Sequence, residues 1–182
     1  MDDLSAAFDD NGWSVGNVGP APGGPHLTLF TASAPAKLGA RELDRIAKDL
    51  AGASISILPE KKYPRGASPN ADVALASVEL ADAGPARALV RAYPVTRGLE
   101  QKARALESAR AMGGAGMDWL VARAVRTIEV VPASGASDAH VWVLAFALAT
   151  MDLAAIHPPE GGVVFGPKTA RERLAKLGLK LR

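Results

Sequence analysis

The chain has 182 residues, close to the size of one domain, and its 48% apolar and 22% charged side chains exclude a wholly disordered polypeptide. It contains no cysteine, which excludes disulfides, thiolate nucleophiles and cysteine-ligated zinc or iron–sulfur centres. The net charge of +2 is uneven, with −4 on residues 1–83 and +6 on residues 84–182. This asymmetry fits either a dipolar surface that attracts an anionic partner, or an ordinary fold in which the two halves intermix.

The ends and the apolar runs of the chain predict where it resides. The N-terminus begins Met1-Asp2-Asp3 and lacks the positive start and apolar run of a secretory signal. The longest apolar run, 141–149, is shorter than the roughly 20 residues of a membrane span. We therefore expect a cytoplasmic protein without membrane contact. The frequent use of alanine, and of arginine in place of lysine, indicates a bacterium with a GC-rich genome.

The first half of the chain alternates strands and helices. In chain order we expect a helix at 4–10, a strand at 13–18, a flexible Gly/Pro loop at 19–25, a strand at 27–32, a helix at 39–51, a strand at 53–58, a basic loop at 59–71 and a strand at 72–80. The helix at 39–51 is the clearest element. Its apolar residues recur on one face, and Gly52 suits the left-handed position that ends a helix.

The second half is predicted to be more helical. We expect helices at 85–92, 99–112 and 117–125, a strand at 127–131, a helix at 138–151, short strands at 153–156 and 163–165, a helix at 169–176 and an edge strand at 177–182. The helix at 138–151 is apolar nearly all round and should be central. In the helix at 99–112 we expect Leu99, Ala103 and Leu106 to face inward.

These elements predict a single domain over 1–182 of the α+β class, with α/β as the alternative. We expect a layered sheet of five to seven short strands with five or six helices. The strand–helix–strand segments at 27–58 and 127–165 each have the length of a βαβ unit, so the arrangement could be duplicated or ferredoxin-like.

A hydrolase motif is present in letters only. Gly12-Trp13-Ser14-Val15-Gly16 matches G-x-S-x-G, which places a nucleophilic serine on a strained turn between a strand and a helix. Here a predicted helix precedes the motif and a Gly/Pro loop follows it. This context does not fit the motif, so a hydrolase using Ser14 is only an alternative. Its triad partners would come from Asp138, His140, Asp152 and His157.

A phosphate-loop motif is also incomplete. Gly161, Gly166, Lys168 and Thr169 resemble the phosphate-binding pattern, but Pro167 intervenes and has no N–H to offer an anion. Pro167 more simply opens the last helix. A looser anion site with Lys168 remains open.

The best candidate for a catalytic pair is His157 with Glu160, three residues apart on one turn. Histidine is the side chain that carries protons near neutral pH, although His157 before two prolines also suits a plain turn. The histidines and nearby acids show no recognised metal-ligand spacing. We therefore expect no metal site and no cofactor.

The basic loop offers a nucleic-acid hypothesis. Lys61, Lys62, Tyr63 and Arg65 could hold phosphates and stack one base. The arginines that would extend this surface are Arg87, Arg91, Arg97, Arg104 and Arg110. Aromatic residues make up only 5% of the chain, so nucleic acid is a possible partner but not the favoured one.

The leading functional hypothesis is a non-catalytic interaction or regulatory protein that self-associates. No catalytic motif survives inspection of its context, and the leucine-bearing tail offers an edge for pairing between two copies. We therefore expect a homo-oligomer or a protein partner. An enzyme using His157 and Glu160 or Ser14, and a nucleic-acid-binding module, remain the alternatives.

Overall fold

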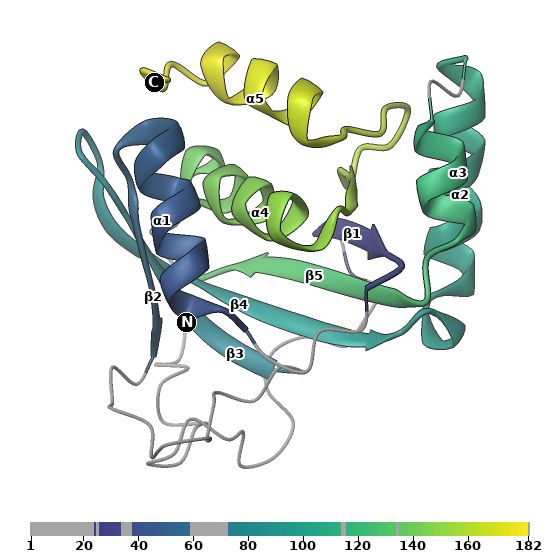
Figure 1. Ribbon diagram of the computed structural model, residues 1–182, viewed down its shortest axis with the longest axis horizontal. Helices are drawn as coiled ribbons and strands as arrows, with labels where there is room; N and C mark the ends of the chain where they lie inside the picture. Colours follow the sequence, from purple (N-terminus) through teal and green to yellow (C-terminus); the bar gives the residue numbers. More distant parts are fainter. Residues whose placement is uncertain are drawn as a thin grey trace.

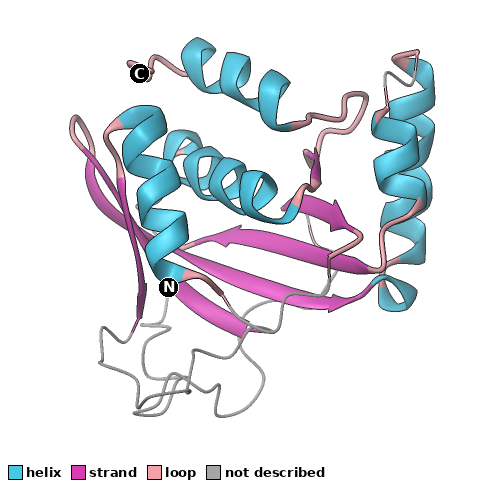
Figure 2. Cartoon of the chain, viewed as in Figure 1, coloured by secondary structure: helices cyan, strands magenta, loops and turns pink. Residues whose placement is uncertain are grey.

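The computed structural model describes residues 24, 26–33, 38–58, 73–113, 116–133 and 135–181. Its strands are β1 (Leu27–Thr31), β2 (Ser54–Leu58), β3 (Val73–Leu80), β4 (Gly84–Pro94), β5 (Arg126–Pro132) and β6 (Ala155–His157). Its helices are α1 (Ala40–Ala51), α2 (Leu99–Ala111), α3 (Met117–Ala122), α4 (Asp138–Asp152) and α5 (Pro167–Lys176), with a short 3₁₀ turn η2 (Val95–Arg97). One antiparallel sheet of six strands with these helices confirms the α+β prediction for the described residues (Figure 2).

The strand order is β2-β3-β4-β5-β1-β6, and every neighbouring pair is antiparallel. Strands β1 and β2 therefore run in the same direction, because four antiparallel pairings separate them. Strands β5 and β6 also run in the same direction, on either side of β1. Each strand–helix–strand segment thus joins parallel strands that are not neighbours, as in a ferredoxin-like split βαβ unit, with the β3–β4 hairpin inserted between β2 and β5.

The main core lies on one face of the sheet. Helices α1 and α4 pack on this face, and α5 packs on the outer side of α4 (Figure 1). Helix α4 is buried along the whole of 141–149 because it has the sheet on one side and α5 on the other. This position explains its apolar composition, and it confirms the prediction that the helix is central.

The other face of the sheet carries α2 and α3 at one end, where they stand against β1 and β6 (Figure 1). The second core cluster there contains Phe30, with Ala105 and Ala109 of α2 and Val121 of α3. Lys102 joins the two helices, because its ammonium donates to the carbonyl oxygens of Ala122 at 2.8 Å and Ala124 at 3.1 Å.

At the opposite edge of the sheet, β2 is held by α1. The carboxylate of Asp44 accepts hydrogen bonds from the Ser54 hydroxyl at 2.8 Å and the Ile55 backbone amide at 3.1 Å. Successive amides of a paired strand alternate between its neighbour and the outside, so Asp44 occupies an outward-facing amide of the edge strand. At the other edge, β6 forms an isolated bridge between Ile156 and Phe165.

The predicted helix at 85–92 is wrong, because this stretch lies in β4. Its alanines and arginines have high helix propensity, but Gly84, the first residue of β4, adopts φ +68° directly after the turn at 81–83, and the chain then runs back along β3. Pairing with β3 on one side and β5 on the other then outweighs the local preference.

The inward face predicted for α2 is confirmed only at Leu106, which is partly buried against the Phe30 cluster, and is wrong for Leu99 and Ala103. Leu99 is 61% exposed and Ala103 is exposed, while Ala105 and Ala109 are fully buried. These two small residues, four positions apart, let the helix approach Phe30 closely. Helix α2 has no wide apolar stripe, so periodicity could not identify its buried side.

The predicted edge strand at the C-terminal end is not formed over the described residues, which end at 181. Its backbone amides instead complete the end of α5, with Leu177 donating to the carbonyl of Arg173 and Leu179 to that of Leu174. Leu177, Leu179 and Leu181 are partly buried against the main core. Their alternation therefore reflects contact with this molecule and not a free strand.

Several other predictions have mixed outcomes. The strands at 27–32, 53–58, 72–80 and 127–131 are confirmed within a residue or two. The strand expected from Leu153 begins at Ala155, and 163–165 contributes only the Phe165 bridge. The helix at 4–10, the strand at 13–18, the loop at 59–71 and all of the 19–25 loop except Gly24 lie outside the described residues. None of the helices in the described ranges has the length and apolar character needed to cross a bilayer.

Leu153, which ends α4, should be replaceable by glycine with a gain in stability. It adopts the left-handed conformation, with φ 48° and ψ 53°, and is 71% exposed, so little packing offsets the strain. We expect Leu153→Gly to raise the free energy of unfolding by about 0.5–1 kcal/mol. Leu153→Ala keeps the strain and should give no gain in urea denaturation. Equal effects of the two substitutions would contradict the role given to the backbone.

Candidate functional site

A row of four polar side chains crosses the sheet on the face that carries α2. Arg91 on β4 is paired with Glu129 on β5, Glu129 with Thr28 on β1, and Thr28 with His157 on β6. We call Arg91, Glu129, Thr28 and His157 the polar row. All four are buried, with Glu129 fully inaccessible to solvent. Burying this many polar groups in line is costly unless they are satisfied or used.

The β4–β5 end of the polar row is an ion pair with a third member. The Arg91 guanidinium donates to one Glu129 carboxylate oxygen at 2.8 Å, and the Tyr93 hydroxyl donates to the other at 2.8 Å. Burial raises the pKa of Tyr93 well above its usual range, and the Glu129 carboxylate raises it further. Tyr93 is therefore a permanent donor to the buried carboxylate.

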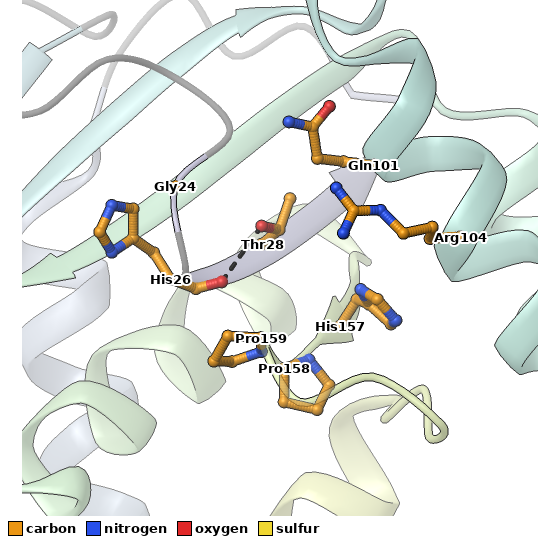
Figure 3. A pocket seen from close by; sticks show the side chains of 8 residues that line it. All are labelled: Gly24, His26, Thr28, Gln101, Arg104, His157, Pro158 and Pro159. Carbon is orange, nitrogen blue, oxygen red and sulfur yellow. Dashed lines mark hydrogen bonds between the residues drawn. The ribbon is translucent and has the colours of Figure 1, made fainter.

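The β1–β6 end of the polar row opens into a pocket of about 260 Å³, which we call the His157 pocket (Figure 3). Strand β1 and the residues before it supply one side, α2 supplies a second, and the end of β6 with the turn after it supplies the third. The lining residues are Gly24, His26, Thr28, Gln101, Arg104, His157, Pro158 and Pro159. Gln101 and Arg104 lie three positions apart and so share one face of α2.

His157 lies against α2 and is only 9% exposed. Its Nε2 is hydrogen-bonded to the Ser108 hydroxyl at 3.2 Å. Burial lowers the pKa of His157, and the Arg104 guanidinium lowers it further, while Glu160 acts weakly in the opposite direction. The imidazole is therefore neutral at neutral pH, and it offers hydrogen bonds to a ligand without a positive charge.

His26 lies across the pocket from Arg104 (Figure 3). Burial lowers its pKa, the Glu129 carboxylate raises it and Arg91 lowers it again. The Nε2 atom is buried and makes no hydrogen bond to the described residues. His26 is thus a second neutral imidazole, electrostatically coupled to the buried ion pair and holding an unsatisfied polar atom.

The charge of the His157 pocket comes from Arg104. Among the described residues that line it there is no carboxylate, and the lowered pKa values of His26 and His157 leave both imidazoles neutral at neutral pH. The Glu100 carboxylate is 3.7 Å from the Arg104 guanidinium, but both side chains are mostly exposed, so this pair leaves the cation available. The chemistry of the lining, one guanidinium with amide, hydroxyl and imidazole groups, suits an anion.

The predicted pair of His157 and Glu160 is divided between two pockets. Glu160 is exposed and lines a neighbouring pocket of about 160 Å³, while His157 lines the larger one. The charge of Glu160 has the smallest effect among the groups that shift the pKa of His157. Catalysis by the pair stays a prediction.

The remaining triad candidates have other contacts. The Nδ1 atom of His140 accepts from the Ser137 amide, so its Nε2 carries the proton and donates to the carbonyl of Gly84 at 3.0 Å. His140 therefore caps α4 together with Ser137. The backbone carbonyl of Asp152 accepts from the Thr31 hydroxyl at 2.7 Å, and burial raises the pKa of the Asp152 side chain. Ser14 lies outside the described residues.

Only some of the residues predicted to bind an anion or nucleic acid lie within the described ranges. Lys168 is exposed in the first turn of α5 and lines neither of these two pockets. Lys61, Lys62, Tyr63 and Arg65 lie outside the described residues. Arg91 is buried against Glu129, so the five arginines cannot form one continuous contact surface. Within the described ranges, no group of three histidine or acidic residues is placed to hold a metal ion.

Sequence reasoning missed most residues of the site. Glu129 is the only charge within the strand Thr127–Val131, and that isolation in an apolar strand was the available indication. Arg91 was considered only for nucleic acid, because the wrong helix at 85–92 gave no sign that it pairs across a sheet, and Tyr93 was not singled out. Gln101 was not singled out, and Arg104 was considered only for nucleic acid. In comparisons with known proteins, the chain matches no family model, no curated protein and no solved structure.

Proposed function

We propose that this protein is a non-catalytic binding or regulatory protein whose ligand is a small anion held in the His157 pocket. The observation that carries the proposal is the lining itself: in the described part of the chain it consists of the Arg104 guanidinium, two neutral imidazoles and other uncharged residues, without a carboxylate. Guanidinium groups bind carboxylates and phosphates through two parallel hydrogen bonds, and Gln101 and Thr28 add further polar groups beside Arg104.

Binding is favoured over hydrolysis by the position of Ser108. Its hydroxyl is hydrogen-bonded to His157, as in a nucleophile–base pair, but Ser108 lies inside α2. Backbone amides in the interior of a helix are bonded within the helix, so they cannot stabilise a developing oxyanion. The Ser108–His157 bond is better suited to fixing the orientation of the imidazole.

Arg104 provides the test. We expect acetate or inorganic phosphate to bind the intact protein in isothermal titration calorimetry at neutral pH and low salt. Arg104→Gln should weaken that binding tenfold or more, because a hydrogen bond to a charged group contributes about 1.5–3 kcal/mol. Arg110→Gln is the matched control, since Arg110 is exposed on the same helix and lines neither pocket. It should bind as the unaltered chain does.

Two results would contradict the proposal. One is the absence of binding heat with both anions for the unaltered chain. The other is an equal loss of affinity in Arg104→Gln and Arg110→Gln, which would indicate a general effect of net charge.

A further inference from the structure

The His157 pocket has a neighbour that shares two of its residues. His26 and Pro159 line both the His157 pocket and the pocket of about 160 Å³, which we call the Trp142 pocket. Leu27 and Thr28 point to opposite faces of the sheet, so the two pockets lie on opposite faces and adjoin only at the end of β1, where His26 and Pro159 line both. Ligand sites for organic molecules usually have volumes of roughly 300–1,000 Å³, which neither pocket reaches alone, so a ligand of that size would have to extend from one pocket past His26 and Pro159 into the other.

Part of the wall of the Trp142 pocket is apolar. Leu27, Val130, Val141 and Trp142 belong to the main core and are almost completely buried, so they hold this part of the pocket in a fixed shape. Phe165 packs edge-on against Trp142, with ring centroids 5.0 Å apart, and this contact fixes the indole further. This part of the wall offers a surface to hydrocarbon.

The charges around the two pockets assign an orientation to a ligand that spans them. Asp138 and Glu160 line the Trp142 pocket, whereas none of the described residues that line the His157 pocket is a carboxylate. Arg173 also lines the Trp142 pocket, with its guanidinium over the Trp142 ring, 5.7 Å from the centroid, so two carboxylates stand against one guanidinium among the described residues of this lining. The negative end of a ligand is therefore favoured at Arg104 and disfavoured beside Asp138 and Glu160.

We propose that the ligand is an amphipathic anion, with a carboxylate or phosphate group at Arg104 and an apolar or aromatic tail in the Trp142 pocket. This inference rests on the proposed anion-binding function and specifies its ligand class. His26 lies at the junction of the two pockets, where its buried and unsatisfied Nε2 is placed to meet the head group or the first atoms of the tail.

The test compares anions with and without a tail. We expect 3-phenylpropionate to bind at least tenfold more tightly than acetate, and phenyl phosphate at least tenfold more tightly than inorganic phosphate, because the tail removes apolar surface from water. A gain in only one of the two series supports the proposal and identifies the head group. No gain in either series would overturn it.

Two alanines of the loop before α4 locate the tail. Ala136 lines the Trp142 pocket, so Ala136→Leu should fill the pocket and reduce the affinity for 3-phenylpropionate to that for acetate, with acetate binding unchanged. Ala133→Leu, in the same loop but lining neither pocket, should leave the preference intact. If circular dichroism shows that Ala136→Leu does not fold, Ala136→Val makes the same test with a smaller side chain.

The outcomes separate the two proposals. Failure of acetate and phosphate to bind at all would refute the anion-binding function itself. Tight binding of the small anions with no preference for a tail would refute only the amphipathic ligand. A tail preference that survives Ala136→Leu would also refute it, because the tail would then lie elsewhere.

Discussion

Glu129→Leu is expected to lower the free energy of unfolding by about 3–5 kcal/mol, because removing one partner leaves a buried charge uncompensated. The Arg91 guanidinium would lose the carboxylate that lies 2.8 Å away, and the Tyr93 hydroxyl would lose its acceptor. Urea denaturation followed by circular dichroism measures the loss, provided that the slope of the transition is unchanged.

A double variant provides the control for this prediction. Arg91→Met combined with Glu129→Leu removes both charges and leaves apolar side chains of similar length, so it should cost much less than Glu129→Leu alone. The interpretation fails if the double variant is as unstable as the single one. The loss of stability would then come from packing and not from the Arg91 charge that loses its carboxylate partner.

Leu148→Ala is expected to cost about 2–5 kcal/mol, the usual range for a large-to-small substitution in a core. Leu148 is fully buried in α4, between the sheet and α5, so the lost methyl groups leave a cavity that rigid elements surround. Leu99→Ala is the matched control, since Leu99 is 61% exposed at the start of α2. It should change the stability by no more than about 0.5 kcal/mol in the same urea titration. Comparable losses in the two variants would show that the packing described for α4 is not what stabilises the fold.

The sequence predicts the fold best where one periodicity dominates. The stripe from Leu43 to Leu50 identified α1, and the continuous apolar run identified α4 as central. Strand β4 was missed because alanine and arginine favour a helix locally, while its strand state depends on pairing with β3 and β5. Pairing partners distant in the sequence leave no local trace in composition.

The candidate site was predictable only in part. His157 was selected for its chemistry, and the structure places it in a pocket, yet its proposed partner Glu160 lines the neighbouring one. Arg104 and Glu129 contribute to the site through strand register and through the docking of α2. Neither contribution can be deduced from spacing along the chain. Glu129 joins the site only when β5, β1 and β6 become neighbours, and Arg104 joins it only when α2 docks on the sheet.

The hydrogen bond from Ile55 to Asp44 has a consequence for the way copies of this molecule could assemble. A second chain adding a strand beside β2 would have to displace that carboxylate, and one adding beside β6 would meet the Phe165 bridge. Asp44 already engages the Ile55 amide of β2, and the bridge to Phe165 already engages the amide and carbonyl of Ile156 in β6. Any homo-oligomer is therefore expected to form through side-chain surfaces, and continuous sheets running from one copy into the next are disfavoured.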